Sequence, residues 1–238
     1  MTPLDLVIAS LVIAIGASIQ GGVGFGMNLI AAPILAVLDP DLVPGPAIVA
    51  AVLLTLLVAH RERASIDRRG VTFALVGRLP GTIAGALLVA SIPESSITLT
   101  VGIAVLFAVA LNVSGLRFRP NAPTLLVAGA VSGFASTVSS VGGPPMAVVY
   151  ANEPGPVIRA NLSFIFVVGG TMSLIALIAV GDFGREETIA SALLLVPGTA
   201  GFLLSKRLAA HVDAGKTRHA VLAVAVLGAV VALAKELV

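Results

Sequence analysis

An otherwise apolar part of the chain is interrupted by Ser139-Ser140-Val141-Gly142-Gly143-Pro144-Pro145-Met146. A similar interruption, Gln20-Gly21-Gly22-Val23-Gly24-Phe25-Gly26-Met27-Asn28, occurs earlier, and the Val-Gly pairs of the two stretches are 118 residues apart. Glycine adopts backbone conformations that other residues resist, and proline is tolerated in the first turn of a helix. Each stretch is therefore predicted to be an unwound break that leads into the start of a new helix.

The composition around these breaks is that of a membrane protein. Hydrophobic residues make up 58% of the 238 residues, charged residues make up 11%, and the mean hydropathy is +1.09. A soluble domain carries about 25% charged residues, and about 20 apolar residues suffice for a helix to cross the hydrocarbon core. The sequence therefore predicts an all-α polytopic membrane protein in a lipid bilayer, with apolar runs at 4–20, 22–38, 42–59, 70–91, 95–116, 122–138, 143–152, 159–181, 186–205 and 217–237.

The runs beside the two breaks differ from the rest. The runs at 4–20 and 22–38 are joined by glycines instead of a polar loop, and the run at 143–152 is too short to cross alone. Irregular backbone at membrane depth is tolerated only where protein or a water-filled cavity surrounds it. Each broken segment is therefore predicted to be a re-entrant or hairpin segment.

The two halves of the chain resemble each other beyond the breaks. Pro44-Gly45-Pro46 matches Pro154-Gly155-Pro156, and Leu79-Pro80-Gly81-Thr82 matches Val196-Pro197-Gly198-Thr199. These matches come in the same order and at nearly the same offset, which favours an internal repeat. We expect one membrane domain made of two repeats, each with one broken segment and three transmembrane helices, at 1–116 and 122–238.

Charged residues in the connections indicate how the repeats are oriented. Cytoplasmic loops carry an excess of Lys and Arg, which assigns to the cytoplasm the basic connections at 60–69, 117–119 and 206–218. The remaining connections are acidic on balance, at 39–41, 94 and 182–187. This assignment puts both termini outside the cytoplasm and the two repeats in opposite orientations. Inverted-topology repeats are common in secondary transporters, where paired broken segments mark the binding site.

The two breaks carry the candidate binding site. A helix N-terminus offers free N–H donors and a partial positive charge, which suits an anion. Neutral side chains and glycine backbone are predicted to complete this cradle, and they are Gln20, Gly22, Gly24, Gly26, Asn28, Ser139, Ser140, Gly142 and Gly143. The alternative is that such glycines only allow close helix packing, which we expect for those of segments 81–85 and 129–133.

Three further polar residues are candidate ligands for the same anion. Arg78 is the one charged residue well inside an apolar run, where a charge is costly and usually faces a cavity or a partner. It either attracts the anion or extends to the cytoplasmic interface. Arg159 begins the span after the second break, near the cytoplasmic side, and either attracts an anion or serves only as positive-inside charge. Asn161 lies further into the same span and could face the site.

The residues present argue against several other functions. The chain has no cysteine, and His60, His211 and His219 lie in or beside basic connections rather than at membrane depth. The sequence offers no histidine and carboxylate cluster for a metal, and no histidine placed to act as a base for the serines of the second break. We therefore expect no enzyme activity, no cofactor and no metal. The lack of a long basic run argues against nucleic acid as a partner.

The motifs at the breaks also occur together in a known family. They are Val141-Gly142-Gly143-Pro144-Pro145 with Tyr150, then Arg159-Ala160-Asn161-Leu162, and in the first half Gly21-Gly22-Val23-Gly24-Phe25-Gly26 with Ala32-Pro33. With the repeated Pro-Gly-Thr elements and the total length, the chain resembles the TauE/SafE sulfite exporter family. The resemblance implies a prokaryotic inner-membrane transporter that moves sulfite or an organosulfur anion, usually outward.

These features predict a transport mechanism and leave alternatives to it open. We expect alternating access around a midplane site, with hinges near Pro80 and Pro197. The membrane potential is a sufficient driving force for an anion, since one charge is worth about 2.3 kcal/mol per 100 mV. The sequence leaves open an anion channel, and an uptake permease for another small oxyanion such as thiosulfate or a sulfonate. It also leaves open whether the protein is a monomer or a homodimer.

Overall fold

The computed structural model describes residues 2–23, 26–208 and 214–237. Over these ranges the chain is helical, with no strand. Its α-helices are α1 Pro3–Val23, α2 Met27–Leu38, α3 Gly45–Glu62, α4 Arg68–Ser91, α5 Ile97–Val113, α6 Ala122–Ser139, α7 Gly143–Tyr150, α8 Gly155–Val180, α9 Arg185–Leu208 and α10 Ala214–Leu237. Seven stretches, in α1, α3, α4, α5, α6, α8 and α9, are long and apolar enough to cross a membrane. The prediction of an all-α polytopic membrane protein is confirmed.

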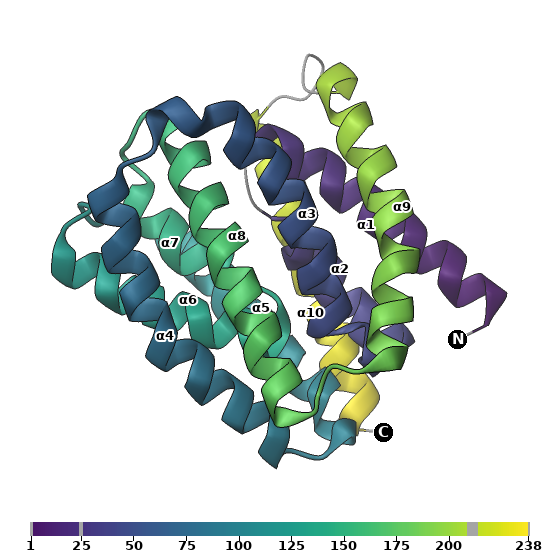
Figure 1. Ribbon diagram of the computed structural model, residues 1–238. Helices are drawn as coiled ribbons and strands as arrows, with labels where there is room; N and C mark the ends of the chain where they lie inside the picture. The colour runs from purple at the N-terminus through teal and green to yellow at the C-terminus, as the bar shows by residue number, and fades with distance from the viewer. Residues whose placement is uncertain (1, 24–25, 209–213, 238) are drawn as a thin grey trace.

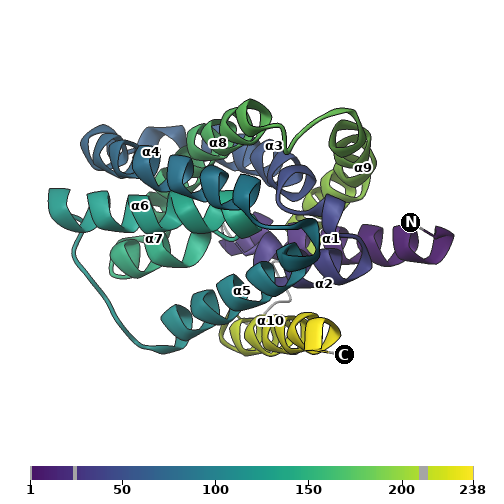
Figure 2. The same ribbon diagram turned by 90° about the horizontal axis from the view of Figure 1, so that it is seen from below.

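The helices form three layers. Seen from below, α4, α8, α3 and α9 follow one another along one side of the molecule, and α5 and α10 lie on the opposite side (Figure 2). The pairs α6 and α7, and α1 and α2, lie between these layers. Both outer layers are built of apolar helices, and the breaks lie in the middle layer between them.

The contacts between helices follow a regular pattern across the two halves of the chain. Helix α4 packs on α6, and α9 packs on α1, while α3 packs on α8 and α5 on α10 (Figure 1). Helices α4 and α9 are each 24 residues long. The internal prolines Pro80 and Pro197 stand at the same place in these two helices, twelve residues after the first residue. Each proline removes one backbone hydrogen bond from the middle of its helix.

Glycine allows α4 and α6 to approach closely. A Cβ atom at Gly77 would collide with the Leu126 carbonyl group, and one at Gly81 would collide with the Ala130 carbonyl group. On the facing helix, a Cβ at Gly129 would meet the Ala74 carbonyl group. The expectation that the glycines of these two segments serve helix packing is confirmed, because backbone-to-backbone contact is what small residues allow in membrane helices.

The helix that follows each break is short. Helix α2 has 12 residues and α7 has 8, which corresponds to about 18 Å and 12 Å at 1.5 Å per residue. Neither length crosses a hydrocarbon core of about 30 Å. The backbone N–H of Phe118 donates to the Val148 carbonyl (3.2 Å), so α7 returns to the connection that leads into α6. Helices α6 and α7 therefore pack against each other as a hairpin.

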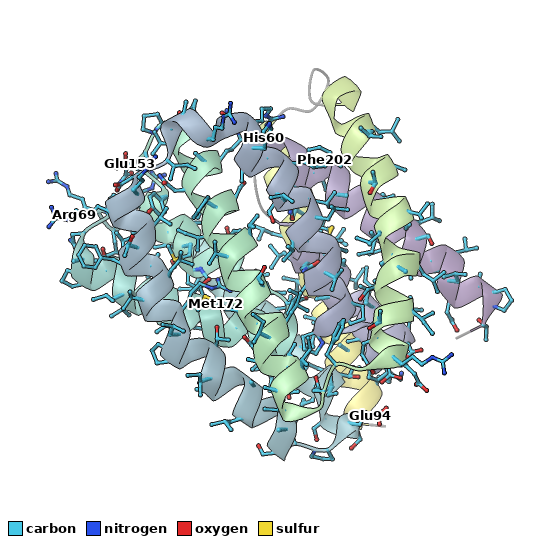
Figure 3. The ribbon with its side chains drawn as sticks, in the orientation of Figure 1. His60, Arg69, Glu94, Glu153, Met172 and Phe202 are labelled. Atoms are coloured by element: carbon cyan, nitrogen blue, oxygen red, sulfur yellow. The ribbon has the colours of Figure 1, made fainter. Side chains whose placement is uncertain are left out.

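The charged side chains gather at the two ends of the helices. Figure 3 shows His60, Arg69 and Glu153 toward the upper end and Glu94 at the lower end. The chain termini are marked in the lower half of the molecule (Figure 1). At the lower end, a cleft of about 230 Å³ is lined by carboxylates from both halves of the chain, namely Asp41, Glu94, Asp182 and Glu187.

Candidate functional site

A small cavity lies between the two breaks. Its volume is about 60 Å³, which is room for a few water molecules or a ligand of a few heavy atoms. The first break contributes Gln20, Gly26 and Asn28 to its lining, and the second contributes Ser140, Gly142 and Gly143. Helices α3 and α8 close its sides with mainly apolar residues, which are Ile48, Ala51, Val52, Thr55, Phe166 and Gly170. The structure thus brings together six of the predicted site residues.

The first break is held by two amide side chains. Gly26 precedes α2 in a left-handed conformation, with φ of 115°. The Met27 backbone N–H donates to Gln20 Oε1 (3.2 Å), which satisfies a helix-start donor. Asn28 Nδ2 donates to the Ala47 carbonyl (3.2 Å) and to the Ser140 carbonyl (3.1 Å), and its Oδ1 is buried without a partner. Asn28 therefore joins the two breaks and keeps one free acceptor.

Ser140 forms the turn at the second break. This residue ends α6 in a left-handed conformation, with φ of 60°, and its backbone N–H donates to the Ser136 carbonyl (2.8 Å). Its hydroxyl is buried and has no partner. The Ser139 hydroxyl instead donates to the Ala135 carbonyl (2.8 Å), and it does not line the cavity. Of the two predicted serines, Ser140 is the one whose hydroxyl is free for a ligand.

The start of α7 offers fewer donors than a typical helix start. Its first residues are Gly143, Pro144, Pro145 and Met146, and the two prolines have no N–H. Of the four N–H groups that are usually free at a helix start, counted from the cap residue Gly142, only those of Gly142 and Gly143 are present. The side chains and the charge that surround the second break therefore matter more for an anion than the helix start alone.

Arg78 supplies that charge from behind the cavity wall. Its side chain is fully buried, so it does not extend to the membrane interface. Nη1 donates to Ser132 Oγ (2.7 Å), and Ser132 Oγ donates to the Gly142 carbonyl (2.6 Å). The guanidinium lies 6.0 Å from the ring centre of Phe166, and its Nε and Nη2 have no partner. Two hydrogen bonds thus connect Arg78 to a residue that lines the cavity.

Two other predicted residues lie away from the cavity. Arg159 Nε contacts Glu62 Oε1 (3.2 Å) at the end of α3. The Asn161 side chain is buried, and its Oδ1 accepts a hydrogen bond from the Asp67 backbone N–H (2.8 Å). Both residues therefore meet the connection between α3 and α4. Of the remaining predictions, Gly22 is in the last turn of α1, and Gly24 lies outside the described residues.

Several residues of the cavity were not predicted. Ser136 lines it and stands four residues before Ser140, a spacing that puts two residues on one helix face and that could have identified it. Thr55 and Phe166 come from α3 and α8, where the apolar sequence gives no such signal. Ser132 was expected only as a packing residue, yet it connects Arg78 with Gly142.

Over the part of the chain that the structure describes, there is no group of three or more His, Asp or Glu residues that could hold a metal ion. The polar groups around the cavity are amides, hydroxyls and one guanidinium behind them, which are groups that bind and orient an anion.

The fold and the cavity define a polytopic helical membrane protein with a small polar site between two broken segments. The family model described as "Sulfite exporter TauE/SafE" matches residues 8–232, so the chain belongs to this family of membrane transporters. The resemblance stated from the sequence is confirmed. No curated protein and no solved structure matches the chain.

Proposed function

We propose that this protein exports sulfite or a related small organosulfur anion by alternating access around the cavity between the two breaks. The observation that carries the proposal is this cavity of about 60 Å³, whose lining includes the free polar atoms of Asn28 and Ser140. Membership of the sulfite exporter family supports the substrate class. The cavity is suited to a compact oxyanion because its space is small and its sides are largely apolar.

The charges and donors around the cavity favour an anion over a cation. The Ser140 hydroxyl and the N–H groups of Gly142 and Gly143 are donors at the second break. Arg78 adds a full positive charge two hydrogen bonds away. At a separation of about 8 Å and an effective dielectric constant near 20, a unit charge is worth about 2 kcal/mol. Asn28 Oδ1 is a free acceptor, which suits an oxyanion that carries one proton.

Alternating access follows from an inverted repeat, which we propose for residues 1–116 and 122–238. The matching contacts of α4 with α6 and of α9 with α1 support it, as do the equal lengths of α4 and α9. In this proposal one repeat rocks against the other around the fixed site. Pro80 and Pro197 are the hinges, because each lacks a backbone hydrogen bond in mid-helix.

The remaining predicted residues have supporting roles in this proposal. Arg159 and Asn161 lie at the connection between α3 and α4, where the basic residues indicate the cytoplasm. There Arg159 raises the local concentration of the anion before it enters, and Asn161 fixes the connection by accepting a hydrogen bond from the Asp67 backbone N–H. Gln20, Gly22 and Ser139 maintain the shape of the breaks. The protein would lie in a prokaryotic plasma membrane with both termini outside.

Sulfite efflux from proteoliposomes tests the proposal. Purified protein is reconstituted in vesicles loaded with sulfite, and efflux is followed beside sulfate and acetate controls. We expect saturable sulfite efflux, reduced about tenfold by Asn28→Ala, which corresponds to about 1.4 kcal/mol. Asn152→Ala is the matched control, because Asn152 is an exposed asparagine that accepts a hydrogen bond only from Arg117.

Other results would change the proposal in defined ways. Flux of thiosulfate or a sulfonate without sulfite would keep the site and change the substrate. Single-channel currents would replace the carrier by a channel. The absence of any anion flux in folded protein would refute the transport proposal.

A further inference from the structure

Arg78 is a buried charge without a counter-charge. Its side chain is the largest among the fully buried residues. In the described part of the chain, its one hydrogen-bond partner is a neutral hydroxyl, Ser132 Oγ. The sequence has no Asp or Glu between Asp67 and Glu94, or between Glu94 and Glu153. The carboxylates are thus confined to the ends of these helices, and none is available at the depth of Arg78.

The surroundings of Arg78 are shaped for a guanidinium. A Cβ atom at Gly169 would collide with Arg78 Nε, so the missing side chain of Gly169 leaves the space that the guanidinium fills. The ring of Phe166 lies 6.0 Å from the guanidinium and also lines the cavity. Arginine keeps its proton in proteins, so the positive charge is permanent. An aromatic ring and a hydroxyl compensate such a charge only in part.

We infer that this protein is an anion exchanger, in which Arg78 requires an anion in the cavity whenever the site moves across the membrane. The inference rests on the proposed function, because it assumes that the cavity is the transport site. With an anion bound, the guanidinium has a counter-charge and the centre of the protein is close to neutral. Without one, an unpaired charge stays at the fully buried position of Arg78, and an unpaired buried charge is strongly destabilising.

The unpaired charge of Arg78 slows the step in which the empty site returns. After an anion leaves on one side, the empty site must move back before the next cycle, and this step carries the uncompensated charge. A counter-anion that binds from the opposite side removes that penalty. The exchange of one anion for another is therefore faster than net efflux into an anion-free medium.

The experiment compares these two modes in wild-type protein. Proteoliposomes are loaded with radiolabelled sulfite, and the membrane potential is clamped at zero with potassium and valinomycin. Labelled efflux is measured into medium that contains either unlabelled sulfite or gluconate, which is too large for the cavity. We expect efflux to be at least tenfold faster with external sulfite.

The outcomes separate the inference from the proposal on which it rests. Equal efflux in the two media would overturn the exchange inference and leave the transport proposal standing. No protein-dependent efflux in either medium would overturn both.

Variants of Arg78 test whether its charge makes exchange faster than net efflux. Arg78→Gln is expected to slow both modes and to bring their ratio toward one, because the empty site no longer carries a charge. Arg78→Lys keeps the charge and is expected to keep the ratio. Arg69→Gln is the matched control, because Arg69 lies on the same helix and is exposed. A wild-type ratio in folded Arg78→Gln, verified by gel filtration, would overturn the role of Arg78.

Discussion

The two breaks are held by different side-chain chemistry. In the first, Gln20 Oε1 accepts a hydrogen bond from the Met27 backbone N–H, and Asn28 donates to the carbonyls of Ala47 and Ser140. In the second, the guanidinium of Arg78 acts through Ser132 on the Gly142 carbonyl. Neutral hydrogen bonds hold one break, whereas a permanent charge supports the other. The pattern of helix contacts is similar in the two halves, so the difference between them is one of charge.

The position of the charge makes this difference clear. Arg78 stands two residues before Pro80 in α4, and the residue two before Pro197 in α9 is Leu195. The same place in the two helices therefore holds a cation in one half and an aliphatic side chain in the other. A site that only had to hold two helices together would not need this asymmetry, because a buried charge is costly.

Replacing Arg78 by leucine, the residue at the corresponding place in α9, should have the largest effect. We expect Arg78→Leu to lower sulfite efflux about 100-fold, which is about 2.7 kcal/mol. The protein should still fold, because replacing a buried charge by an apolar residue is often neutral or stabilising. Efflux from proteoliposomes and the thermal midpoint in detergent measure the two effects. Arg69→Leu on the exposed face of α4 is the control, and wild-type efflux in Arg78→Leu would show that the asymmetry has no role in transport.

A second difference between the halves concerns packing beside the two prolines. A Cβ at Gly81 would collide with the Ala130 carbonyl group, whereas a Cβ at Gly198 would meet only Ile13 Cγ2 at 3.4 Å, an ordinary contact. We expect Gly81→Ala to destabilise the protein by about 2 kcal/mol through overpacking. Gly198→Ala should be neutral or slightly stabilising, since alanine favours helix over glycine. Thermal unfolding followed by circular dichroism compares them, and equal shifts would contradict the packing described here.

Several features of the fold and the site can be predicted from the sequence alone. The breaks, the apolar runs and the packing glycines were predicted because they depend on local composition and backbone freedom. The residues at the breaks, such as Asn28, Ser140 and Gly142, were predicted for the same reason, and the structure places them around one cavity. Each of these predictions needs only neighbouring residues along the chain.

Other parts of the site depend on how distant helices meet. Ser132 becomes the partner of Arg78 only because α4 crosses α6 at close range. Arg159 pairs with Glu62, 97 residues earlier, and so meets the connection after α3 instead of the cavity. Hydropathy and spacing carry no information on such contacts, since the partner could be any polar residue at a similar depth.

The left-handed residues of the two breaks provide a third test. Gly26 occupies this conformation in the first break and Ser140 in the second. Ser140→Gly removes the free hydroxyl but keeps a residue that adopts this conformation readily. We expect unchanged stability and a KM for sulfite efflux raised about tenfold, or about 1.4 kcal/mol, because a hydrogen bond to the anion is lost. An unchanged KM would remove Ser140 from the binding site.

The smallest expected effect compares the two ends of the molecule. At one end Glu62 contacts Arg159 (3.2 Å), whereas at the other Asp182 shares a cleft with Glu187 and Asp41. Burial, together with these two carboxylates, raises the pKa of Asp182 to about 6. A carboxyl group with a raised pKa binds its proton more tightly in the folded state, so its ionisation costs stability as the pH rises from about 4 to above 6.

Removing the carboxylate should therefore raise the stability of the protein at Asp182 and lower it at Glu62. We expect Asp182→Asn to stabilise the protein by about 1 kcal/mol at pH 7.5, after allowance for solvent screening of a half-buried group. The gain should vanish near pH 4, where the carboxyl group is already protonated in the native state. Glu62→Gln leaves Arg159 without its counter-charge, and we expect it to lower stability at pH 7.5 by up to about 1 kcal/mol. Thermal midpoints at both pH values measure these effects, and a gain for Asp182→Asn that persists at pH 4 would show that the gain does not come from the ionisation of Asp182.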